Sequence, residues 1–133
     1  MIVNEALKKI STIAFKKNAE KVIETIAEEL LSFNKQAKIV KLENEKTQLN
    51  DGNFYISIGK QLFFDDFNFD EISSKYPEGF VYVKLDESGK GYIVSSKTYL
   101  LYSAFCYLNE ELAKEDISIL KNGKIIQPSF IWQ

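Results

Sequence analysis

The sequence contains no histidine and no arginine, so all 17 of its cationic side chains are lysines. Without histidine, the chain cannot form a Ser-His-Asp triad, a Cys-His pair or an imidazole metal site. Without arginine, it lacks the planar guanidinium that binds phosphate and carboxylate groups in a bidentate manner. The groups left for chemistry are carboxylates, lysines, tyrosines and hydroxyls, which is a small set for an enzyme.

Cysteine and long apolar runs are also scarce. The single cysteine, Cys106, excludes an intrachain disulfide and a cysteine zinc cluster. Its position in an apolar helical pattern predicts a buried, inert thiol. No apolar run approaches the roughly 20 residues of a membrane span, and the first residues show no apolar core of a signal peptide. We therefore expect a soluble chain without a membrane anchor, and its compartment stays open.

The charge balance and composition limit the class of protein further. A net charge of −2 gives no general attraction for nucleic acid or for an anionic membrane. A chain of 133 residues that is 45% hydrophobic and 27% charged is long and apolar enough to fold around one core. We expect a single domain over residues 1–133, with no motif for a metal or another cofactor.

Two stretches predict amphipathic helices. Apolar residues recur at helical spacing over residues 19–33, after a candidate N-cap at Asn18. A second helix follows a cap at Ser95 or Ser96. The apolar stripe of this second helix consists of Leu101, Ala104, Phe105, Leu108 and Leu112.

Strand patterns fill most of the remaining chain. Alternating or continuous apolar runs predict strands at 10–16, 37–43, 54–60, 80–85 and 92–95, with the last two joined as a hairpin. Residues 117–128 predict a second hairpin, because Asn122-Gly123 suits a type I′ turn and Pro128 ends the strand. The element order is β-α-β-β-β-β-α-β-β, which predicts an α+β fold in which two main helices pack on a mixed sheet. Residues 1–9 are either a short helix or a disordered leader.

The segment "FFDDFNFDE" (63–71) has the most unusual composition, with four phenylalanines among four acids. A calcium loop would need a D-x-D-x-D-G pattern, which is absent. A glycosidase pair would need two carboxylates facing each other across a sugar, and the sequence does not show this. We expect a loop whose phenylalanines cover the sheet while its acids stay solvated, and its role stays open.

Three further features have competing interpretations. "GKGY" (89–92) precedes a strand rather than a helix, so it is not a phosphate loop. Four lysines could form a basic patch, but the acidic net charge favours a solvated face; they are Lys60, Lys84, Lys90 and Lys97. The tyrosines of the second helix could stack on sugar rings, although a core or interface role is at least as common. The candidate interface or glycan contacts are Tyr99, Tyr102, Tyr107 and Trp132.

Several motifs together resemble a known module. "AEEL" (27–30) follows a strand, and Ile58-Gly59 ends another strand. "EGF" (78–80) then leads into a hairpin, a strand and the helical segment "LYSAF" (101–105). This order resembles the small N-terminal domain, similar to domain 2 of chitobiase, that precedes the catalytic barrel in bacterial α-glucuronidases and β-N-acetylhexosaminidases. The resemblance covers about residues 10–132, and "PSFIWQ" falls where the chain would enter the barrel.

The resemblance implies an accessory domain and no active site. Ser103 stands where the family has a glycine, and the barrel that carries the catalytic carboxylates is absent from this chain. No catalytic residue can therefore be transferred, and we expect no enzyme activity from this chain by itself. The first hypothesis is a non-catalytic accessory domain of a carbohydrate-active enzyme. Its expected partners are the barrel of the same parent chain and a carbohydrate. The alternatives are a free-standing protein- or glycan-binding module and a small carboxylate-dependent enzyme.

Overall fold

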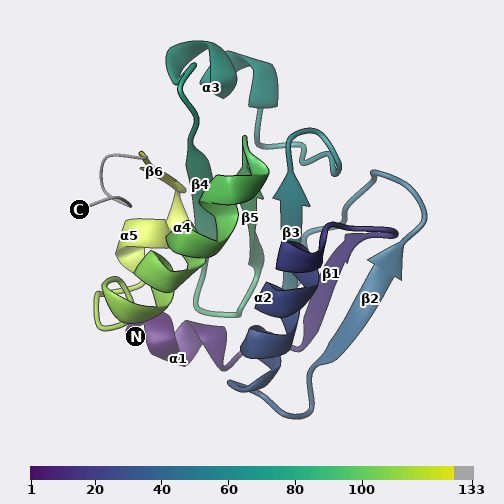
Figure 1. The fold of residues 1–133 in the computed structure, drawn as a ribbon. Coiled ribbons are helices and arrows are strands. Elements are labelled where there is room, and N and C mark those ends of the chain that lie inside the picture. Colours follow the sequence, from purple (N-terminus) through teal and green to yellow (C-terminus); the bar gives the residue numbers. More distant parts are fainter. Residues whose placement is uncertain (128–133) are drawn as a thin grey trace.

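Six strands form one mixed sheet in the computed structural model, which describes residues 1–127 (Figure 1). The strand order is β2-β1-β3-β5-β4-β6. The strands are β1 (Thr12–Lys16), β2 (Lys38–Leu42), β3 (Asn53–Ile58), β4 (Val81–Leu85), β5 (Gly91–Ser95) and β6 (Lys124–Ile126). The helices are α1 (Val3–Leu7), α2 (Lys21–Leu31), α3 (Phe69–Lys75), α4 (Thr98–Glu110) and α5 (Ser118–Lys121).

The predicted mixed sheet with two main helices is confirmed. Strand β1 pairs in parallel with β2 and β3, and β3 pairs in parallel with β5. Strand β4 is antiparallel to both β5 and β6. Strands alternate with helices along the chain, so the architecture is an α/β fold. None of the helices within residues 1–127 has the length and apolar character of a membrane span.

The main core lies between the sheet and the pair α2 and α4, which lie side by side on one face (Figure 1). Every residue of the predicted α4 stripe is buried, from Leu101 to Leu112. These side chains contact the sheet residues that point to the same face, such as Phe15 and Ile56. Each large apolar side chain buried in this way contributes about 1.5–3 kcal/mol before conformational entropy is counted.

A second, smaller core covers the opposite face of the sheet. Tyr55, Tyr92 and Val94 point to this face because neighbouring side chains of a strand alternate. Phe64, from the segment that follows β3, is buried against them. The expectation that phenylalanines of residues 63–71 cover the sheet is therefore confirmed for Phe64. The neighbouring ring of Phe63 is instead mostly exposed.

The N-terminal residues belong to the fold. Of the two alternatives for residues 1–9, the helix is the one observed, because Val3–Leu7 form α1. Val3 and Leu7 are fully buried in the main core, and the backbone N–H of Val3 donates to the carbonyl oxygen of Glu115 at 2.8 Å. This segment is therefore not a leader separate from the domain.

The predicted second hairpin is wrong. Residues 118–121 form the short helix α5, and β6 pairs with β4 instead of with a preceding strand. Ile117 and Leu120 are both buried, and this spacing of three residues fits a helical turn better than a strand. Asn122 has a φ of −102°, so a type I′ turn, which needs positive φ at both central residues, does not form. Pro128, the predicted end of this strand, lies outside the described residues.

The helix starts differ from the predicted caps. Helix α2 begins at Lys21 with Glu20 as its N-cap, while Asn18 adopts a φ of 63° in the preceding turn. Helix α4 begins after Lys97, and neither Ser95 nor Ser96 is the N-cap. The hydroxyl of Ser95 instead donates to the carbonyl oxygen of Lys97 at 2.6 Å, within the turn between β5 and α4.

Candidate functional site

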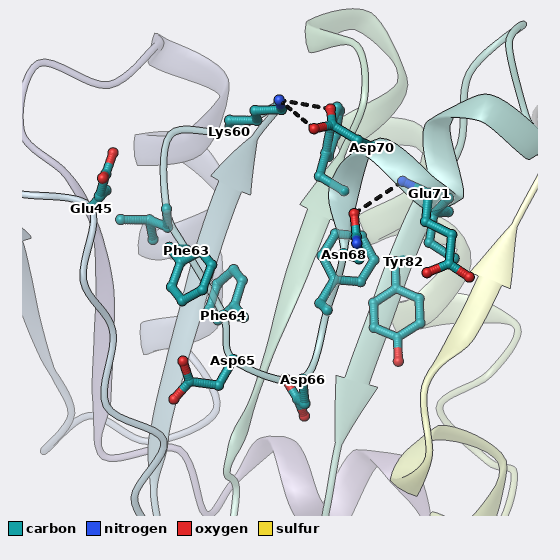
Figure 2. A pocket seen from close by; sticks show the side chains of 15 residues that line it. Glu45, Lys60, Phe63, Phe64, Asp65, Asp66, Asn68, Asp70, Glu71 and Tyr82 are labelled. Carbon is teal, nitrogen blue, oxygen red and sulfur yellow. Dashed lines mark hydrogen bonds and ion pairs between the residues drawn. The ribbon is translucent and has the colours of Figure 1, made fainter.

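A pocket of about 810 Å³ lies on the face of the sheet opposite α2 and α4 (Figure 2). Residues 59–72, which we call the 59–72 segment, supply every lining residue except Glu45 and Tyr82. Figure 2 shows this segment running from the end of β3 past the two rings of Phe63 and Phe64 and then up to α3. The pocket is therefore built mainly by the acidic and aromatic stretch that stood out in the sequence.

Hydrogen bonds hold the 59–72 segment on the sheet. The backbone N–H of Leu62 donates to the hydroxyl of Ser57 at 3.1 Å, and that of Phe63 donates to the carbonyl oxygen of Glu45 at 2.7 Å. At the far end, the side-chain oxygen of Asn68 accepts from the backbone N–H of Glu71 at 3.1 Å and caps α3 (Figure 2). The pocket wall is thus fixed at both ends.

Asp66 and Phe64 anchor the middle of the segment. One carboxylate oxygen of Asp66 accepts from the hydroxyl of Tyr92 at 2.8 Å, and the other pairs with the ammonium of Lys84. The ring of Phe64 stacks on Tyr92, with ring centroids 3.9 Å apart and an interplanar angle of 11°. Both contacts converge on β4 and β5, so the segment is joined to the centre of the sheet.

These contacts shift the pKa values of the groups involved. Burial alone would raise the pKa of Asp66, but the hydrogen bonds from Lys84 and Tyr92 outweigh it and lower the pKa below its ordinary value of 3.8. Burial raises the pKa of Tyr92, and its hydrogen bond to the Asp66 carboxylate adds to the effect. At neutral pH the phenol therefore donates and the carboxylate accepts.

We expect Asp66→Asn to lower the free energy of unfolding at neutral pH by about 1 kcal/mol, since one charge-assisted contact is lost at a partly exposed site. The folded-state pKa of Asp66 is depressed, so its stabilisation is present above its ordinary value of 3.8 and disappears as the pH falls below it. Urea unfolding of both proteins should show a difference at neutral pH that shrinks in acid. A difference that stays constant across this range would contradict the assigned role of the carboxylate.

The rim of the pocket carries the remaining charges. The ammonium of Lys60 contacts both carboxylate oxygens of Asp70, at 2.7 and 2.8 Å (Figure 2). Glu45 and Asp65 have no ion pair with any residue from 1 to 127. Phe63, which lines the same pocket, is 57% exposed. This combination offers hydrogen-bond acceptors and an accessible ring face.

The predicted tyrosines lie elsewhere, on the helical face. Tyr99 and Tyr102 are exposed on α4, whereas Tyr107 is partly buried against the main core. The hydroxyl of Tyr102 donates to a carboxylate oxygen of Glu29 on α2 at 2.8 Å, which raises the pKa of Tyr102 to about 12. Tyr99 and Tyr102 are therefore close together on α4, Tyr107 does not share their exposure, and Trp132 lies outside the described residues.

The surroundings of Cys106 and of three lysines can be compared with those predicted from the sequence. Cys106 is only half-buried, so the predicted burial of its thiol is not complete. Burial nevertheless raises the pKa of its thiol and keeps it protonated, which agrees with low reactivity. Lys60, Lys84 and Lys90 each pair with an aspartate, as on a solvated mixed-charge surface.

Sequence reasoning identified residues 63–71 as unusual but missed the pocket that they form. In the part of the chain that the structure describes, no group of three or more acidic or cysteine side chains is placed to hold a metal ion. Comparisons with protein-family models, curated proteins and solved structures found no match to this chain. The resemblance to an accessory domain thus rests on the motifs of the sequence.

Proposed function

We propose that this chain is a non-catalytic accessory domain of a carbohydrate-active enzyme and packs on a catalytic barrel of the same parent protein. The resemblance of residues 10–132 motivates the proposal. The order of elements supports it, because Ile58-Gly59 lies at the end of β3, Phe80 precedes β4, and residues 101–105 lie in α4. These are the elements that the resemblance implies at those motifs.

The observation that carries the proposal is the outer face of α4. Among residues 1–127, the large hydrophobic side chains that are exposed are Met1, Phe63, Tyr99 and Tyr102. Two of these four, Tyr99 and Tyr102, are three residues apart on one helix and therefore neighbours on its surface. Exposed tyrosines are typical of the centre of protein interfaces, where they combine a large apolar ring with a polar hydroxyl. We assign this face to the contact with the barrel.

We expect the double change Tyr99→Ser and Tyr102→Ser to destabilise the parent protein by about 2 kcal/mol or more, as for central interface residues. In the isolated chain of residues 1–133, the same change should alter stability by no more than about 0.5 kcal/mol, because both side chains are exposed there. Thermal unfolding of both forms measures the two effects.

The matched control for this experiment is Phe63→Ser, which removes an exposed aromatic ring from the opposite face of the sheet. This change should leave the thermal stability of both the parent protein and the isolated chain nearly unchanged. Equal effects of the tyrosine change on the two forms would mean that α4 does not contact the barrel.

One observation favours a second candidate, a free-standing protein- or glycan-binding module. The pocket of the 59–72 segment provides the concave surface that such a module needs. If the α4 tyrosines instead form the binding surface, calorimetric binding of a glycan should disappear in Tyr99→Ala and Tyr102→Ala. If the pocket is the site, binding should survive those changes and depend on Phe63.

A further inference from the structure

We propose that the pocket of the 59–72 segment binds an organic cation, in which a protonated amine is carried on an apolar or ring-shaped body. This site lies on the opposite face of the sheet from α4. The proposal is therefore independent of the accessory role, and it applies whether the chain acts alone or beside a barrel.

The size and walls of the pocket suit a small organic group. A volume of about 810 Å³ lies within the range of about 300–1,000 Å³ that is typical of small-molecule sites. Aromatic rings line it from two elements: Phe63 is largely exposed, and Phe67 stacks on Tyr82 of β4 with ring centroids 4.7 Å apart. An ammonium group placed over the face of such a ring is attracted by its negative quadrupole.

The charge of the pocket lining determines which sign of charge a ligand should carry. Five carboxylates line the pocket, against one lysine, Lys60. Adding Lys84 and Lys75, which pair with Asp66 and Glu71 from outside the lining, still leaves an excess of two carboxylates. The lining therefore disfavours phosphates and other anions, and it favours a positively charged ligand over a neutral one. The carboxylates are Glu45, Asp65, Asp66, Asp70 and Glu71.

The rim leaves part of this charge available to a ligand. Asp66 is engaged by Tyr92 and Lys84, Asp70 is engaged by Lys60, and Glu71 is engaged by Lys75. Glu45 and Asp65, in contrast, have no ion pair within residues 1–127, and both line the pocket together with the exposed ring of Phe63. Lys60 is itself exposed, and exposed ion pairs are weak, so an incoming amine can compete with it for Asp70.

The test is a titration of the ¹⁵N-labelled chain with benzylammonium and, separately, with benzyl alcohol, which keeps the ring and removes the charge. We expect benzylammonium to cause saturable changes in the amide chemical shifts of the 59–72 segment. Benzyl alcohol should bind with roughly fivefold lower affinity. The double change Glu45→Gln and Asp65→Asn should lower the affinity for benzylammonium roughly fivefold. Lys60→Met should raise this affinity. The double change Glu110→Gln and Glu111→Gln, an equal loss of charge at the exposed end of α4, should leave the affinity for benzylammonium unchanged.

A second arm distinguishes the source of the cation. A blocked tetrapeptide with one lysine is compared with the same peptide in which norleucine, which has no charge, replaces the lysine. Tighter binding of the lysine peptide than of benzylammonium identifies a lysine side chain of a protein as the ligand. Tighter binding of benzylammonium identifies a free amine. Equal binding of benzylammonium and benzyl alcohol, an unchanged affinity of the Glu45→Gln and Asp65→Asn double variant for benzylammonium, or no shift with either amine would overturn the proposal.

Discussion

Phe105→Ala is expected to lower the free energy of unfolding by about 3–5 kcal/mol, the range for a fully buried phenylalanine. Phe105 lies in the middle of α4 and is only 1% exposed. Its ring is part of the main core between α2, α4 and the sheet, so truncation removes apolar contacts and leaves a cavity. Urea unfolding monitored by circular dichroism measures the change.

The matched control is Tyr99→Ala on the same helix, where the ring is 62% exposed. In the isolated chain this change should stay within about 0.5 kcal/mol of the unsubstituted protein. A cost below about 0.5 kcal/mol for Phe105→Ala would place that side chain in solvent. The assigned rotation of α4, and with it the exposed position of Tyr99 and Tyr102, would then be wrong.

Phe64→Ala should also cost about 3–5 kcal/mol, although Phe64 lies outside any helix or strand. Its ring is 2% exposed, stacks on Tyr92 and contacts Tyr55 edge to face. The neighbouring change Phe63→Ala removes an equally large ring that is mostly exposed, and should cost no more than about 0.5 kcal/mol. Chemical denaturation of the two variants, which differ by one position, provides the comparison.

Similar costs for the two variants would contradict the observed packing of the 59–72 segment. Because side chains on an extended segment alternate in direction, a shift of one residue would bury Phe63 and expose Phe64. The pocket would then lose its exposed ring and the stacking on Tyr92. The comparison therefore also tests the geometry on which the cation site depends.

The main elements of the fold could be predicted because their apolar patterns are local. The stripe of α4 and the alternation in β3 follow from the periods of a helix and a strand. The hairpin of β4 and β5 follows from two short strands around a glycine-containing turn. Each of these signals is contained in a few neighbouring residues, and no distant partner is needed to interpret it.

The elements that were missed depend on distant partners. Helix α5 forms where Ile117 and Leu120 are both buried, yet the short run "ISIL" also resembles a strand. Helix α1 is fixed by the contact of Val3 with Glu115, which is more than 100 residues away in the sequence. Asn18 is a good N-cap by residue type, but its positive φ places it in the turn before the helix.

The candidate site was predictable in composition but not in geometry. Residues 63–71 stand out in the sequence, whereas the direction of each side chain depends on Asp66 reaching Lys84 and Tyr92, 18 and 26 residues further along. Likewise, the sequence separates the buried stripe of α4 from its tyrosines. It does not show that Tyr107 packs against the core while Tyr99 and Tyr102 stay exposed.

The most direct test of the proposed accessory role is the intact mass of the native gene product, isolated from its host through an antibody against residues 1–127. A domain that packs on a barrel of the same chain predicts a protein longer by roughly 250 residues, the usual size of such a barrel. Activity on aryl glycosides should accompany that larger protein. A native product of 15.3 kDa, the mass of these 133 residues alone, would contradict the proposal.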